Sequence, residues 1–78
     1  MEARAILARN IRRVRKAARM TQETLSFRAG VSRSYMSDLE CARRSPTIEL
    51  ISRLAKALEV SAADLVEGIP EQVTDKAS

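Results

Sequence analysis

The fold is decided by residues 21–40, which read TQETLSFRAGVSRSYMSDLE. Thr21 and Ser32 have the short hydroxyl side chains that cap helix N-termini, and Gly30 can adopt the left-handed backbone that ends a helix. The pattern therefore predicts two short helices, one over residues 22–29 and one from Ser32 to about residue 40, separated by a turn that contains Gly30.

The apolar residues of this stretch predict how the two helices pack. A small residue, Ser26, stands where two helices would cross closely, and the apolar positions are Leu25, Ala29, Val31, Met36 and Leu39. This spacing folds the two helices across each other and leaves the beginning of the second one exposed.

The exposed face of the second helix carries short polar side chains and one long donor: Ser32, Arg33, Ser34, Ser37 and Asp38. Such a face fits a helix that enters the DNA major groove, where an arginine can bond a guanine edge bidentately and small hydroxyls permit close approach. The alternative is that these are solvated polar residues of a small helical domain.

Helical periodicity continues on both sides of this stretch. A first amphipathic helix is predicted over about residues 3–18, Thr47 caps a fourth helix after Pro46, and an S-x-x-D capping box begins a fifth at Ser61. We therefore expect an all-α fold of five helices without strands. The predicted core consists of Leu7, Ile11, Val14, Leu25, Val31, Met36, Leu39, Ile51, Leu54 and Leu58.

Composition sets the domain organisation and excludes several functions. The 78 residues suffice for one domain, expected over residues 1–68, followed by a flexible acidic tail over 69–78. With no His and one Cys, Cys41, the chain cannot build a His/Cys metal site, a Ser-His-Asp triad or an internal disulfide, and nothing indicates a cofactor or an enzyme.

Two aromatic residues are too few for a platform on which single-stranded nucleic-acid bases stack. The longest apolar run, Ala5–Ala8, is too short for a signal or membrane segment, so we expect a soluble, cytoplasmic protein with no membrane partner.

The net charge of +4 is distributed unevenly along the chain. Residues 1–20 carry seven basic and one acidic residue, residues 41–56 carry four and one, and residues 57–78 carry one and five. Two basic blocks followed by an acidic end indicate a polyanionic partner. The alternative is that arginine and lysine serve here as good helix formers on solvated faces.

Residues 11–65 resemble the Cro/C1-type (XRE-like) helix-turn-helix DNA-binding proteins from end to end. The motifs that carry the resemblance are MTQ, AGVSRSYMSDLE and a proline followed by a helix ending LAKALEVS. The start VSRSYMS is similar to the controller proteins of restriction–modification systems. The resemblance implies a five-helix lambda-repressor-like domain, with the helix-turn-helix formed by helices 2 and 3, that regulates transcription by binding double-stranded DNA.

The resemblance also implies roles for individual residues. Gln22 would hold a phosphate, Arg33 and Ser34 match the base-reading positions, and Tyr35 is as consistent with packing as with reading. Arg15 and Glu40 match a buried, structural ion pair. The expected DNA-binding residues are Gln22, Ser32, Arg33, Ser34, Tyr35, Ser37, Asp38, Arg43 and Arg44.

Three positions depart from the family pattern. Ser26 replaces the usual alanine and needs a hydroxyl partner, such as a carbonyl one turn back. Thr24 replaces a frequent glutamate, which removes a capping box with Thr21. Ala42 stands where glycine is frequent, so a left-handed backbone there would cost about 1 kcal/mol, or the loop over residues 41–45 would differ.

We expect a symmetric homodimer formed through the carboxy-terminal part of the chain, because one such domain reads too few base pairs to find a single site in a genome. Helices 1–3 are needed for the core and for DNA. The expected dimer interface is Val60, Leu65, Val66 and Ile69. The alternatives are that these residues complete the core of one protomer, or that the protein is an antitoxin-type module that binds a partner protein as well as DNA.

Overall fold

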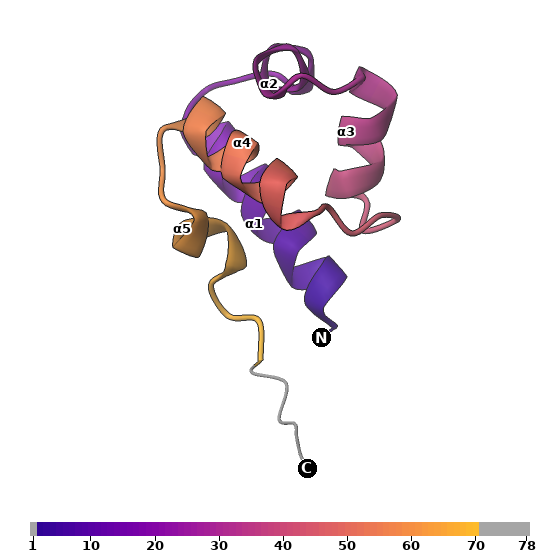
Figure 1. Ribbon diagram of the computed structural model, residues 1–78, viewed down its shortest axis with the longest axis vertical. Coiled ribbons are helices and arrows are strands. Elements are labelled where there is room, and N and C mark those ends of the chain that lie inside the picture. The colour runs from indigo at the N-terminus through magenta and orange to yellow at the C-terminus, as the bar shows by residue number, and fades with distance from the viewer. Residues whose placement is uncertain (1, 71–78) are drawn as a thin grey trace.

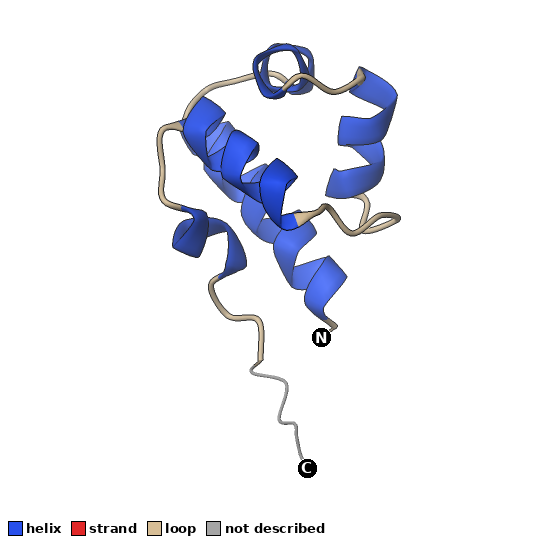
Figure 2. Ribbon diagram, in the orientation of Figure 1, coloured by secondary structure: helices blue, strands red, loops and turns tan. Residues whose placement is uncertain are grey.

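The computed structural model describes residues 2–70 and consists, over that range, of five helices and no strands (Figure 2). The helices are α1 (Ala3–Ala17), α2 (Gln22–Ala29), α3 (Arg33–Glu40), α4 (Ile48–Leu58) and α5 (Ala62–Val66). The predicted all-α fold is confirmed. Within the described range, no helix combines the length and apolar character needed to cross a bilayer. Most of the predicted tail, residues 71–78, lies outside the described residues.

Four of the helices begin at the predicted hydroxyl caps. The side chains of Thr21, Ser32, Thr47 and Ser61 each accept a hydrogen bond from the backbone N–H three residues later. At α5 the cap is reciprocal, because the Asp64 carboxylate also accepts from the Ser61 N–H. Short polar residues at these positions therefore determine where the chain turns into helix.

Left-handed residues end several of the helices. Gly30 ends α2 with φ 77°, as its lack of a Cβ predicts, and Ala42 follows α3 with φ 61°. Ala42 therefore keeps the left-handed conformation in which glycine is favoured. The Ser26 hydroxyl donates to the Glu23 carbonyl at 2.8 Å, which is the kind of partner expected for it.

The helices enclose a single core, with α1 in contact with both α3 and α5 and α4 in contact with both α2 and α5. In Figure 1, α2 crosses one end of the molecule, and α3 and α5 lie on opposite sides of it. The fully buried large side chains are Ile11, Leu25, Met36, Leu39, Leu54 and Leu65.

The core differs from the predicted list at its edges. Val31 and Ile51 are half-buried and pack against the core rather than within it. Ile6, Leu50 and Leu65 are buried although they were not expected in the core. Ile6 and Leu50 are buried because α1 and α4 each pack against two other helices, so the apolar sector of each is wider than a single stripe. Leu65 is the residue by which α5 packs into the core.

The end of the domain is fixed by a buried polar residue of α1. The Asn10 amide donates to the backbone carbonyls of Leu65 and Glu67, both at 2.9 Å. Ile69, expected in the tail, is half-buried and packs against the core. The packed domain thus extends at least one residue beyond the predicted boundary.

Candidate nucleic-acid interface

The first turn of α3 has an accessible face. Met36 and Leu39 are buried in the core, whereas Arg33 and Ser34 are exposed. Ser32 is exposed as well, but its hydroxyl already accepts the Tyr35 N–H at 3.0 Å. The structure therefore presents one long donor and one hydroxyl at the beginning of α3, as a base-reading helix requires.

Glu40, at the end of α3, is the anchor of this helix. Its carboxylate, 2% exposed, accepts two hydrogen bonds from the Arg15 guanidinium, from Nε at 2.6 Å and from Nη2 at 3.0 Å. The remaining Arg15 nitrogen donates to the Met20 carbonyl at 2.8 Å, and Arg12 donates to the Glu40 carbonyl. The expected buried ion pair is present, and it ties α1 and the following turn to α3.

Gln22 has a different partner from the one the resemblance implied. Its side-chain amide donates to Glu40 Oε1 at 3.0 Å. This hydrogen bond connects the first residue of α2 to the last residue of α3 and completes the network around Glu40. One amide hydrogen of the Gln22 side chain is thus engaged within the protein.

A second cluster, formed by Tyr35, Asp38, Arg43 and Arg44, lies along the outer side of α3 and the loop after it. Asp38 pairs with Arg43 Nη1 at 3.4 Å and with Arg44 Nε at 3.3 Å. The Arg44 guanidinium lies 5.1 Å from the centre of the Tyr35 ring, and Tyr35 is half-buried against the core. These four residues, all expected to contact DNA, are therefore linked by contacts within the protein.

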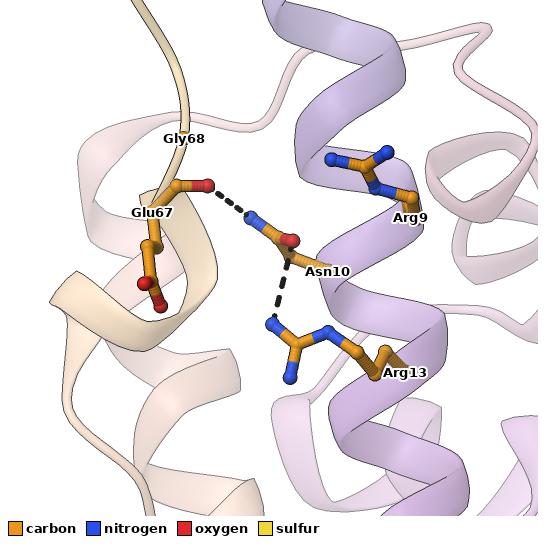
Figure 3. Close-up of a pocket in the computed structure, with 5 residues that line it drawn as sticks. All are labelled: Arg9, Asn10, Arg13, Glu67 and Gly68. Carbon is orange, nitrogen blue, oxygen red and sulfur yellow. Dashed lines mark hydrogen bonds between the residues drawn. The ribbon is translucent and has the colours of Figure 1, made fainter.

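The amino-terminal basic block, residues 1–20, does not form one surface. Arg12 and Arg15 point to α3, whereas Arg9 and Arg13 line a depression of about 520 Å³ beside Asn10, Glu67 and Gly68 (Figure 3). Helical geometry explains the division, because the block extends over several turns of α1. Only part of the block's charge can therefore face a partner bound at α3.

The residues expected at a dimer interface occupy unequal positions. Leu65 is 0% exposed and belongs to the core of the protomer, so its assignment to the interface is wrong. The short α5 has one apolar side, which α1 and α4 cover. Val66 is 36% exposed, and Val60 and Ile69 are half-buried against the core.

The structural role of Asn10 was not predicted, although the sequence contains a signal for it. Asn10 is three residues after Leu7 and four before Val14, which places it on the apolar stripe of α1. A polar side chain on such a stripe must find hydrogen-bond partners, since leaving it unpaired in a core is costly. Its partners could not be named, because they are backbone carbonyls 55 and 57 residues away.

Comparison with known proteins places this geometry in context. A family model described as helix-turn-helix matches residues 11–65. The uncharacterised HTH-type transcriptional regulator y4dJ of Sinorhizobium fredii is 41% identical over 66 residues, which cover 85% of this chain and 86% of that protein.

Two solved structures are similar over most of the chain. The hypothetical transcription factor NHTF from Neisseria has a TM-score of 0.79 at 35% identity and covers 83% of this chain and 75% of its own. The restriction-modification controller protein C.AhdI from Aeromonas hydrophila has a TM-score of 0.77 at 32% identity, with 80% of this chain and 94% of its own covered.

Proposed function

The chain belongs to the Cro/C1-type (XRE-like) helix-turn-helix family of DNA-binding transcriptional regulators, and from this premise we propose that it acts as a homodimer on a palindromic operator. Because its proposed ligand is duplex DNA, we place the protein in the cytoplasm. The observation that carries the proposal is the first turn of α3, where Arg33 and Ser34 are exposed while the far end of the helix is anchored through Glu40.

Rigid support is what a base-reading helix needs. Bidentate pairing of arginine with a guanine edge requires the helix to keep a fixed position in the groove, and each such pair discriminates by about 1–3 kcal/mol. Arg15, Gln22 and Glu40 hold α3 against both α1 and α2. Arg33 is thus carried on a supported helix and is assigned to base reading, with Ser34 beside it.

Phosphate contacts follow from the residues around α3. Arg43 and Arg44 are exposed directly after the helix. We assign them to the DNA backbone, where they supply affinity for every sequence. Ser37 is half-exposed on α3, and we assign it to DNA as a further contact.

Dimer formation supplies the second half-site. One recognition helix reads only a few base pairs, and two of them about 34 Å apart read half-sites about 10 base pairs apart. Among the residues around α5, Val66 is 36% exposed and Val60 and Ile69 are half-exposed, and we assign these three to the dimer interface. A self-complementary patch of this kind places Val66 near its own symmetry mate.

Selection of bound sites from random duplexes tests the proposal. We expect enrichment of a palindrome, and binding whose log–log salt slope is about −5 to −9 if each subunit neutralises about three to five phosphates. Arg33→Ala should lose discrimination at one base position in each half-site, whereas Arg13→Ala, on the side of α5, is the matched control and should retain it. Absence of an enriched sequence would contradict sequence-specific recognition, and an enriched single half-site would contradict the dimer.

A further inference from the structure

Asp38 is the acidic residue of the second cluster, and the resemblance offered it as a further DNA contact. Building on the proposed function, we propose that Asp38 is a positioning residue that restrains Arg43 and Arg44 in the free protein and competes with DNA phosphates for them. In this role Asp38 lowers the affinity for every duplex, whatever its sequence.

The backbone conformation after α3 places Arg43 and Arg44 close to Asp38. The Arg43 N–H donates to the Asp38 carbonyl at 2.9 Å, and the Ala42 N–H donates to the Leu39 carbonyl at 3.2 Å. These two hydrogen bonds, with the left-handed Ala42, form a Schellman turn. The turn reverses the chain and returns both arginines to the last turns of α3.

Each arginine uses a different oxygen of the same carboxylate. Oδ1 pairs with Arg43 at 3.4 Å and Oδ2 with Arg44 at 3.3 Å. Arg44 is held a second time by the Tyr35 ring, 5.1 Å away. Asp38 is about one-quarter exposed, whereas both arginines are mostly exposed, so DNA can reach the guanidinium groups from outside.

The chemistry of the partners makes the carboxylate and a phosphate alternatives. A guanidinium group forms charge-assisted hydrogen bonds with either anion. When Arg43 or Arg44 binds a phosphate, it exchanges the Asp38 oxygen for a phosphate oxygen. This exchange opposes binding without reference to the base sequence.

The test is the affinity of the full chain and of Asp38→Asn for a random duplex and for the selected operator, measured by fluorescence anisotropy at several salt concentrations. We expect both affinities to rise by about 3- to 20-fold, because two exposed ion pairs no longer compete with DNA. The salt slope should become steeper by about one, since one more positive charge is available to neutralise phosphate. Glu67→Gln, which removes an exposed negative charge beside the far depression, is the matched control and should change neither quantity by a comparable amount.

Two further comparisons distinguish restraint of the two arginines from other roles of Asp38. Asp38→Glu keeps the negative charge and should remain near the wild-type affinity. In a chain that already carries Arg43→Ala and Arg44→Ala, Asp38→Asn should have no further effect, and thermal unfolding checks that each variant is folded.

Four results would overturn the inference. A loss of operator affinity with unchanged random-duplex affinity would make Asp38 a base reader, and an effect that persists without the two arginines would show that it acts independently of them. If the wild-type chain binds DNA and Asp38→Asn changes nothing, the inference alone is wrong. If the wild-type chain binds no duplex at all, the proposed function is wrong as well.

Discussion

Glu40 is the residue on which the position of the recognition helix depends. It is buried, charged and bonded to Arg15 and Gln22 through its two oxygens. A buried carboxylate is tolerated only when its charge and its hydrogen bonds are satisfied. The side chains of Arg15, Gln22 and Glu40 therefore form one hydrogen-bonded network, in which each depends on the others.

Removing one member of the buried pair should have a large effect. Arg15→Ala should lower the free energy of unfolding by about 3–5 kcal/mol, because Glu40 is left as an uncompensated buried charge. Urea denaturation followed by circular dichroism measures it. Arg13→Ala, an exposed arginine of the same helix, is the control, and equal small losses in both variants would contradict a structural role for the pair.

Ala42 offers a test of backbone strain at a single position. Its φ of 61° is unfavourable for a residue with a Cβ, so Ala42→Gly should raise the free energy of unfolding by about 0.5–1 kcal/mol despite the added freedom of the unfolded chain. Ala63→Gly, at an exposed helical position of α5, should instead lower it by a similar amount. Destabilisation by Ala42→Gly would show that the turn is not strained.

Among the elements, α5 depends most on its neighbours, since its five residues are too few to be helical alone. Leu65 inserts into the core, and Asn10 of α1 holds the carbonyls at its carboxy-terminal end. These contacts place α5 opposite α3 across the molecule (Figure 1).

Loss of the Asn10 hydrogen bonds should therefore loosen α5 first. Asn10→Ala leaves two carbonyls without this donor and should cost about 1–3 kcal/mol. Amide hydrogen exchange should accelerate in residues 62–69 more than in α2 or α3. Uniform acceleration in all helices would instead indicate that the network holds the whole core, and unchanged exchange would show that Asn10 is not needed.

At the scale of the whole molecule, the proposed dimer gives the sharpest prediction. Val66→Glu should convert the dimer to a monomer in sedimentation experiments at micromolar concentration, because a charge would be buried against its symmetry mate. The wild-type chain should sediment as a dimer in the same experiment. Leu65 is unsuitable for this test, since a charge there would disrupt the core of the protomer.

The control for the dimer is an exposed apolar residue elsewhere. Phe27 on α2 is 84% exposed and lies outside the proposed interface, so Phe27→Glu should leave the dimer intact. A dimer that dissociates with Phe27→Glu and survives Val66→Glu would move the interface to α2. A wild-type chain that stays monomeric even on its operator would contradict dimerisation altogether.

The helices and their caps could be predicted from the amino-acid sequence alone, because they depend on interactions among residues within about four positions of one another. Most of the core could be predicted as well, because the apolar stripe of each helix has the helical period. Thr21, Ser32 and Gly30 act on the backbone next to them, and the apolar stripes repeat with the helical period. The pairing of Arg15 with Glu40 followed from the family resemblance rather than from such local rules.

The partner of each polar residue on these helices could be identified only from the packed fold. The amide of Gln22 meets Glu40, the carboxylate of Asp38 meets two arginines, and Leu65 rather than Val66 turns to the core. A helix of eight residues or fewer has too little periodic pattern to fix its rotation about its own axis. That rotation is set by packing against elements far away in the chain, and it determines which side chains remain free for DNA or for a second protomer.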